Sequence, residues 1–376
     1  MKIAMVGQKG IPATFGGIER HVEEIGTRLV ERGHEVTVYC RPYYTKIDKE
    51  YKGIRLVSIP TIRTKHFDTA SHCALSVAHA MARNFDVVHF HALGPSIFSN
   101  LPRIRGAKTA VTVHGLDWQR EKWGPVASWI LKRCEYTAVH FPTRTIVVSK
   151  VLRDYFMRKY DLRVTYIPNG TSFPQRQPSS RIEEMGLEPD RYVLFVGRLV
   201  PEKGCHYLVE AFERINTDLD LVIAGGASFS SDYVDRLRSK SNPRVRFLGY
   251  VYGTALEDLY AHARLFVLPS DIEGLPIALL EAMSFGTACL CSDIPENVEV
   301  LAGCGAMFAQ GNVEDLAAKI SALLADPDAC RSIGERGRQH ALETYNWDRV
   351  THMTEAAYYS ILSGQPASAQ EQGDGA

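Results

Sequence analysis

The sequence lacks the features that would mark a membrane, secreted or metal-binding protein. Among its 376 residues, no apolar run approaches the roughly 18 residues of a membrane span. The apolar start, Ile3–Val6, stops at Gly7 and is too short for a signal-peptide core. The eight cysteines form no Cys-x2-Cys pair, and no other set of ligands suggests a metal. We therefore expect buried thiols in a reducing cytoplasm, with no metal and no other cofactor.

The chain has no net charge, but its charge is unevenly distributed. Residues 1–170 contain 26 Lys and Arg against 14 Asp and Glu, a charge of +12, so residues 171–376 carry −12. A basic first half favours an anionic partner, such as a phosphate-rich membrane surface or a lipid-pyrophosphate acceptor. No nucleic-acid motif is present, so we expect no nucleic-acid partner. An uneven solvated surface is the alternative. We expect a cytoplasmic protein, with peripheral attachment to the inner face of the plasma membrane left open.

The length predicts two domains. In residues 1–170 predicted strands alternate with helices, as in a parallel sheet. These strands cover residues 2–7, 35–40, 86–91, 109–113, 145–149 and 164–167. The polar run 171–181 reads as a linker, and residues 171–348 repeat the alternating pattern. A final helix, 349–362, precedes a tail, 363–376, that we expect to be disordered because of its composition.

One stretch of the second half combines a buried strand, a loop and a helix. The apolar run 264–268 predicts a parallel strand, and Pro276 suits the first position of the helix that follows. Glu273 lies in the loop and Glu281 in the second helical turn, where we expect burial. The amides of Gly274 and Leu275 would form an anion site at the helix start. A buried Glu281 needs hydrogen-bond donors, which a diol such as a ribose supplies.

A second strand-to-helix junction carries two cations. Arg198 and Lys203 lie in Gly197-Arg198-Leu199-x3-Lys203-Gly204, directly after a predicted strand. Arg198 can bind a phosphate through two parallel hydrogen bonds, and Lys203 adds a mobile point charge. Together they would neutralise a diphosphate and stabilise the charge that grows on it as it departs.

These motifs resemble those of the retaining GT-B nucleotide-sugar glycosyltransferases of the family 4 type. The Glu-Gly-Leu-Pro-x4-Glu-Ala run that begins at Glu273 and the Pro-Glu-Lys-Gly run that contains Lys203 carry the likeness. The resemblance implies an α/β, GT-B fold in which two Rossmann-like doubly wound domains face a central cleft. Residues 1–170 would bind the acceptor and residues 171–348 the nucleotide sugar. The helix 349–362 would cross back onto the first domain, with Trp347 and Tyr358 as docking aromatics.

The resemblance also assigns roles outside the two strong motifs. Gly16 and Gly17, after the first strand, resemble the glycine loop of the family, and glycine lets backbone approach a ligand closely. His114, at the end of another strand, would contact the donor sugar near the reacting carbon. Gly249 and Tyr250 resemble the strand end that meets the base.

Other residues receive weaker interpretations. Asp117, Trp118 and Arg120 extend the loop after His114 and are candidates for the acceptor side. We read His91 as a candidate cleft residue and His89 as a core residue. The Asp218-Leu219-Asp220 run looks like a metal motif of another glycosyltransferase fold, but it precedes a strand, so we interpret it as a turn.

We therefore expect a retaining, metal-independent glycosyltransferase. By the resemblance, Glu273 would orient the sugar and the leaving phosphate would accept the acceptor's proton. The expected acceptor is a glycan or a polyprenyl-pyrophosphate-linked glycan of bacterial surface polysaccharide synthesis. The opening residues 1–12 and the segment 114–120 resemble a rhamnosyltransferase-like subgroup. The alternatives are a nucleotide-sugar epimerase, a phosphorylase, and a non-catalytic protein that binds nucleotide sugars.

Overall fold

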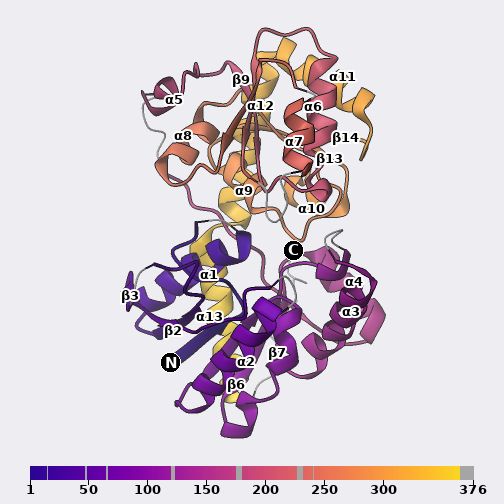
Figure 1. Cartoon of the computed structure of the whole chain (residues 1–376). Coiled ribbons are helices and arrows are strands. Elements are labelled where there is room, and N and C mark those ends of the chain that lie inside the picture. The colour runs from indigo at the N-terminus through magenta and orange to yellow at the C-terminus, as the bar shows by residue number, and fades with distance from the viewer. Residues whose placement is uncertain are drawn as a thin grey trace. The chain divides into compact units, whose positions relative to one another are not determined.

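Two parallel sheets, one in each half of the sequence, organise the chain in a computed structural model (Figure 1). The structure describes residues 1–14, 16–46, 49–64, 67–119, 123–174, 180–226, 232–239 and 241–364. The first unit contains Met1–Asn169 and the chain from Trp347 onward, and the second contains Gly170–Asn346. The predicted α/β class is confirmed. Within the described residues, no helix has the length and apolar character to cross a membrane.

The sheet of the first unit has the strand order β3-β4-β2-β1-β5-β6-β7-β8. Its strands are β1 (Lys2–Val6), β2 (Glu35–Cys40), β3 (Glu50–Tyr51), β4 (Ile54–Ser58), β5 (Val87–His91), β6 (Lys108–Val113), β7 (Arg144–Val147) and β8 (Thr165–Tyr166). All neighbours pair in parallel except β3 and β4. Every residue of β5 is buried, as expected for a parallel strand covered on both faces. The parallel strands therefore end at one edge of the sheet.

Helices cover this sheet. They are α1 (Gly17–Glu31), α2 (Phe67–Met81), α3 (Pro125–His140), α4 (Lys150–Tyr160) and α13 (Trp347–Ser363). In α1 the buried Val22, Ile25 and Leu29 recur at the spacing of one helical face. Gly33 follows α1 with a φ of 86°, a left-handed conformation that suits glycine and ends the helix. The sequence analysis missed β3, β4 and α2.

The last helix belongs to the first unit. In Figure 1, α13 lies beside α1. Trp347 is 1% exposed and Tyr358 fully buried, and both belong to the apolar core of this unit. Polar contacts flank the apolar ones: Arg28 Nε lies 2.9 Å from Asp348 Oδ1, and Arg32 Nη1 lies 3.0 Å from Glu355 Oε2. The end of the chain is thus a structural part of the domain at its beginning.

The second unit has an all-parallel sheet in the order β11-β10-β9-β12-β13-β14. Its strands are β9 (Tyr192–Val196), β10 (Asp220–Ala224), β11 (Val245–Gly249), β12 (Leu265–Leu268), β13 (Ala288–Ser292) and β14 (Ala306–Phe308). Its helices are α5 (Ser180–Glu184), α6 (Cys205–Glu213), α7 (Asp232–Ser239), α8 (Thr254–His262), α9 (Ile277–Ser284), α10 (Pro295–Leu301), α11 (Val313–Ala325) and α12 (Pro327–Thr344). Thr171, expected in a linker, is buried, and its N–H donates to the Tyr345 carbonyl (2.6 Å).

Candidate functional site

The two strand-end motifs of the second unit lie against each other. Because β9 and β12 are adjacent and parallel, the loops after them leave the same edge of the sheet. The Asp271 N–H donates to the Glu202 carbonyl (3.0 Å). A Cβ on Gly204 would lie 1.9 Å from the Pro269 carbonyl oxygen, so only glycine permits this approach. The backbone therefore brings the predicted cation loop to the predicted glutamate loop.

An ion pair between two of the predicted site residues joins these loops. The Nζ of Lys203 lies 2.5 Å from Oε1 of Glu273, and the Ser270 hydroxyl donates to the same oxygen (2.7 Å). The two charged side chains are only 18% and 7% exposed. Such partial burial removes much of the solvent that would otherwise screen the pair. Lys203 and Glu273 therefore hold each other in position at the carboxyl edge of the sheet.

Glu281 is more accessible than expected. Its neighbours Leu280 and Ala282 are fully buried, whereas Glu281 is only partly buried. Its Oε2 accepts a hydrogen bond from the hydroxyl of Tyr260 (3.0 Å), which comes from α8. Glu281 is therefore buried only in part, less than the sequence analysis expected. Glu281 thus combines a fixed orientation with an exposed portion that a ligand can reach.

The start of α9 differs slightly from the prediction. Pro276 is the N-cap residue rather than the first helical residue, and its carbonyl accepts from the N–H groups of Leu279 and Leu280 (3.2 Å each). Gly274 and Leu275 therefore precede the cap, and Leu275 is 4% exposed. Gly274 and Leu275 still lie where they were predicted, between Glu273 and Glu281, at the amino terminus of α9 and beside the carboxyl end of β12.

The ends of β9, β10 and β11 bring the remaining predicted donor-side residues to this edge. The Gly225 N–H donates to the Gly249 carbonyl (2.7 Å), and a Cβ on Gly225 would lie 1.8 Å from the Gly197 carbonyl oxygen. The Tyr250 ring is 41% exposed. Partial burial raises the pKa of Tyr250, and the nearby charge of Arg198 opposes that rise. The charge of Arg198 therefore acts on Tyr250, although two strands separate them in sequence.

In the first unit, Gly16 caps α1 with a φ of 106°. This φ is one that residues with a Cβ rarely adopt, so the turn favours glycine. Oε1 of Glu19 accepts from the Lys9 N–H (3.0 Å), and Glu23 Oε2 accepts from the Ala13 N–H (2.6 Å). Carboxylates of α1 thus hold the loop after β1, which leads to Gly16 and Gly17.

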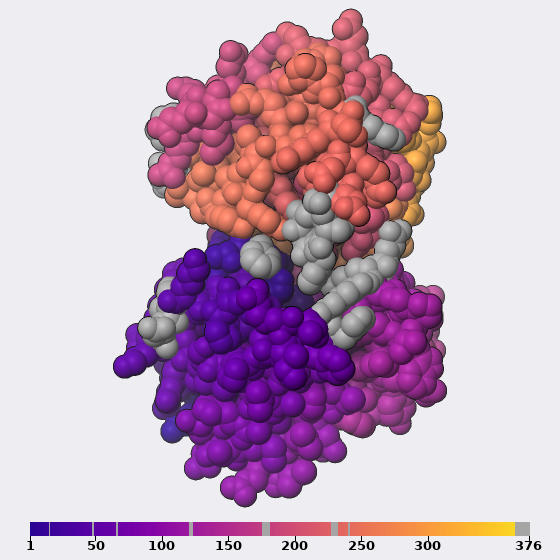
Figure 2. Space-filling view, viewed as in Figure 1, coloured from indigo at the N-terminus to yellow at the C-terminus, as the bar shows by residue number. Residues whose placement is uncertain are grey.

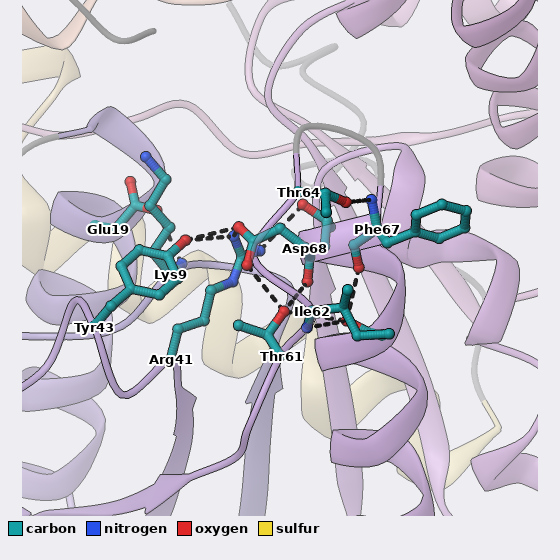
Figure 3. Close-up of polar contacts among 11 residues, drawn as sticks. Lys9, Glu19, Arg41, Tyr43, Thr61, Ile62, Thr64, Phe67 and Asp68 are labelled. Atoms are coloured by element: carbon teal, nitrogen blue, oxygen red, sulfur yellow. Dashed lines mark hydrogen bonds and ion pairs between the residues drawn. The ribbon is translucent and has the colours of Figure 1, made fainter.

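A polar network ties together the loops after β2 and β4 (Figure 3). The Arg41 guanidinium donates to Asp68 Oδ2 (2.5 Å), which also accepts from the Tyr43 hydroxyl (2.7 Å). The Thr61 hydroxyl donates to Asp68 Oδ1 (2.9 Å). The Arg41 side chain is only 4% exposed. Its charge is balanced by Asp68, so this network stabilises loops at the carboxyl edge of the first sheet.

His114 belongs to a group of histidines that the sequence analysis did not assemble. Nε2 of His114 lies 3.2 Å from Nδ1 of His91, at the end of β5. The His21 ring, from α1, packs edge-on against His114 with centroids 4.7 Å apart, and its Nδ1 donates to Oδ1 of Asn169 (2.9 Å). Burial lowers the pKa of His21 to about 4 and that of His91 well below its usual value. Both rings are therefore neutral near pH 7.

His89, in contrast, is a core residue. It is 1% exposed, and both ring nitrogens are bonded, Nδ1 to the Tyr358 hydroxyl (2.6 Å) and Nε2 to the Thr112 hydroxyl (2.7 Å). His91 is equally buried but reaches His114. The sequence signal for this difference was the strand end: His91 is the last residue of β5 and His89 is not.

The predicted acceptor-side loop is anchored to helices of the first unit. Asp117 and Trp118 form a short 3₁₀ helix, and the Trp118 Nε1–H donates to Oε2 of Glu135 (2.8 Å). Glu135 is fully buried. Its Oε1 accepts from Lys159, Tyr155 and Tyr160 at 2.7, 3.0 and 3.0 Å. Arg120 lies outside the described residues.

Asp218 and Asp220 lie at the amino end of β10, away from these strand ends. Asp218 pairs with Arg191 (2.5 Å) and Asp220 with Arg246 (3.4 Å). Both aspartates therefore have cationic side chains as partners within the described structure, as befits a charged turn at the start of a strand.

Comparison with known proteins agrees with the fold and with the family resemblance. Residues 15–172 match the family model described as Glycosyltransferase Family 4, and residues 179–340 match that described as Glycosyl transferases group 1. The chain belongs to the GT-B glycosyltransferases of the family 4 type.

Particular relatives span nearly the whole chain. It is 28% identical to alpha-maltose-1-phosphate synthase of Mycolicibacterium smegmatis, over 96% of this chain and 100% of that protein. It is 26% identical to glycogen synthase of Mycobacterium tuberculosis, over 97% of this chain and 96% of that protein. The fold resembles sucrose-phosphate synthase from Thermosynechococcus elongatus, with a TM-score of 0.82, 21% identity and coverage of 97% and 100%. The fold also resembles Anabaena HepE in complex with UDP and glucose. The TM-score is 0.80 and the identity 19%, and the match covers 96% of this chain and 100% of HepE.

Proposed function

We propose that the protein transfers a sugar from a nucleoside-diphosphate donor to a glycan or lipid-linked acceptor, with retention at the anomeric carbon. The observation that carries the proposal is the Lys203–Glu273 ion pair at the carboxyl ends of β9 and β12, beside the amino terminus of α9. In doubly wound folds, ligands bind at the carboxyl ends of strands. Structures of HepE contain UDP-glucose or UDP, which supports a nucleotide-sugar donor.

In this proposal the second unit binds the donor. Arg198 and Lys203 bind the diphosphate, and the arriving phosphate takes part of the Lys203 contact now made to Glu273. Glu273 is then available to the sugar hydroxyls. Glu281, already oriented by Tyr260, accepts hydrogen bonds from the ribose hydroxyls. The backbone at Gly249 and the Tyr250 ring meet the base.

Bond cleavage then depends on charge. The bond between the anomeric carbon and the diphosphate oxygen breaks with oxocarbenium character, as in glycoside hydrolysis. Arg198 and Lys203 stabilise the negative charge that develops on the leaving oxygen. The acceptor oxygen attacks the same face, and its proton passes to the leaving phosphate. His114 contacts the sugar near the reacting carbon. These cations replace a metal, so the proposed reaction is metal-independent.

The direct test uses purified protein with a panel of nucleotide sugars. We expect one of them to release nucleoside diphosphate, faster when an acceptor is added, and without inhibition by EDTA. The anomeric coupling constant of the product, measured by NMR, reports the stereochemistry. An inverted product would contradict retention, and the absence of release from every nucleotide sugar would contradict the donor class.

We also propose that the first unit docks on an anionic membrane that presents a polyprenyl-pyrophosphate-linked acceptor. On α3, Val126, Trp129 and Ile130 share one face and are 73%, 59% and 49% exposed. The adjacent Lys132 and Arg133 are exposed, whereas Glu135, the single acidic residue of this helix, is buried. Figure 2 shows this magenta region as part of the surface of the first unit. Apolar and basic groups together suit an anionic bilayer.

The biological setting that we propose is bacterial surface polysaccharide synthesis. A 31% identity to O-antigen chain mannosyltransferase B of Escherichia coli, over 44% of this chain, supports this setting. The charge of +12 on residues 1–170 suits a pyrophosphate-linked acceptor. Transfer of radiolabelled sugar to a short-chain polyprenyl-pyrophosphate glycan is the expected activity, and transfer only to free soluble sugars would contradict this acceptor.

A further inference from the structure

We propose that His21, His91 and His114 form a binding site for a divalent transition-metal cation, with Zn²⁺ as the preferred ion, and that occupation of this site inhibits the enzyme. Each of the three side chains offers one ligand atom, and these atoms all lie within 4.8 Å of one another. The three residues come from α1, the end of β5 and the residue after β6, all within the first unit.

The spacing of the first pair of ligands already fits a metal. Nδ1 of His91 and Nε2 of His114 are 3.2 Å apart. Two ligands on a tetrahedral Zn²⁺, at bond lengths of roughly 2.0–2.1 Å, lie about 3.3–3.4 Å apart. A cation can therefore replace the proton that the two rings now share, once the rings turn so that the lone pairs of both nitrogens converge on it. The displaced proton moves to the other nitrogen of the same imidazole ring, so both histidines remain neutral when the metal binds.

His21 is oriented for the third bond. Because the Asn169 Oδ1 can only accept a hydrogen bond, Nδ1 of His21 carries the proton and Nε2 carries the lone pair. A metal-bound histidine typically has this kind of partner on its second nitrogen, which fixes its tautomer and ring orientation. The ligand atom of His21 lies within 4.8 Å of those of His91 and His114, so His21 must move closer to them to share one ion.

The chemistry of the three side chains also suits a transition metal. Imidazole nitrogens suit Zn²⁺, Cu²⁺ and Ni²⁺, and three of them leave a fourth position for water. His114 is only partly buried, so an ion can reach the group at this residue.

The inhibitory consequence rests on the proposed function, but the binding does not. A metal on Nε2 of His114 removes the ring that would contact the donor sugar. Transfer itself needs no metal, since Arg198 and Lys203 supply the positive charge. Free Zn²⁺ would therefore lower turnover, and a chelator would restore it.

Binding is tested on the full-length, metal-free protein by competition with a chromophoric chelator for Zn²⁺. We expect a single tight Zn²⁺ per chain, and His21→Gln and His91→Gln each to weaken it about tenfold or more. His352→Gln, an exposed histidine of the same unit, is the matched control and should bind as the wild type does. Equal affinity in all four proteins, or no tight Zn²⁺ in the wild type, would overturn the proposal.

Two further measurements cover the other outcomes. Circular dichroism shows whether the variants fold. If they do not, Co²⁺ bound to the wild type provides a separate test, because a tetrahedral nitrogen site should give intense visible absorption. A weak octahedral spectrum alone would reject the site. In the transfer assay, Zn²⁺ should inhibit the wild type and His352→Gln alike. Tight binding with unchanged turnover would refute the inhibition, and a protein without transfer activity would leave the binding result to stand alone.

Discussion

The ammonium of Lys203 and the carboxylate of Glu273 lie 2.5 Å apart and join the loops that follow β9 and β12. Each residue thus positions the other before any ligand is present. We expect Lys203→Ala to lower turnover by roughly one to three orders of magnitude, about 1.4 kcal/mol per order. The reason is that it removes a cation from the leaving group and frees Glu273 to change its position. Nucleoside diphosphate release measures the effect.

The control for this variant is Lys319→Ala, an exposed lysine on α11 of the same unit, which should keep wild-type turnover. If Lys203→Ala and Lys319→Ala release nucleoside diphosphate at the same rate, Lys203 has no part in the departure of the leaving group.

Glu281→Ala should weaken nucleotide binding by about tenfold or more, since two hydrogen bonds to a charged acceptor are lost. Tyr260→Phe should have a smaller effect of the same sign, because it removes only the hydroxyl that orients Glu281. Isothermal titration with nucleoside diphosphates gives both affinities. Glu335→Ala, on the exposed face of α12, is the control, and an affinity for Glu281→Ala equal to that of this control would exclude a ribose contact.

Lys159→Met should destabilise the first unit by roughly 1.5 kcal/mol, because the buried carboxylate of Glu135 loses a half-exposed cation but keeps its other hydrogen-bond donors. Arg158→Met, on the adjacent exposed position of α4, should cost little. Urea unfolding compares the two. Since Glu135 also holds Trp118, we expect the tryptophan fluorescence of Lys159→Met to change as well. Equal stability of the two variants would show that the tyrosine and tryptophan donors alone satisfy the carboxylate.

Binding to anionic vesicles should weaken as salt rises, because exposed charges are screened over about 10 Å at 0.1 M ionic strength. Trp129→Ser should weaken vesicle binding further at every salt concentration, since it removes an exposed aromatic from α3. Tyr359→Ser, which alters a 54%-exposed aromatic of α13, is the matched control. If the fraction of protein that sediments with the vesicles changes neither with salt nor with Trp129→Ser, this face does not dock on membranes.

The sequence was sufficient to predict five of the six strands of the second unit and missed β14. Local signals mark the first four strand ends, where Gly197, Gly225, Gly249 and Pro269 follow the apolar runs, and parallel strands bring their carboxyl ends together. The parallel topology alone therefore predicts that Lys203 and Glu273 lie at the same edge of the sheet. The partial exposure of Glu281 was not predictable, since it depends on how α9 packs and on Tyr260 from another helix.

The histidine group was beyond local reasoning for a related physical reason. His21, His91 and His114 come from three separate elements, and only the pairing of β1, β5 and β6 and the packing of α1 bring them together. The segment containing β3, β4 and α2 was missed because its signals are weak. β3 has two residues, and the buried positions of β4 are interrupted by Arg55.

The return of α13 to the first unit has a consequence for biosynthesis. When the ribosome has added Asn346, every residue of the second unit has been made, whereas the core of the first still lacks Trp347, Val350 and Tyr358. Domains commonly mature in the order of their synthesis. Here the unit encoded first must wait for the last helix, so all residues of the second unit are made before those of the first unit are complete.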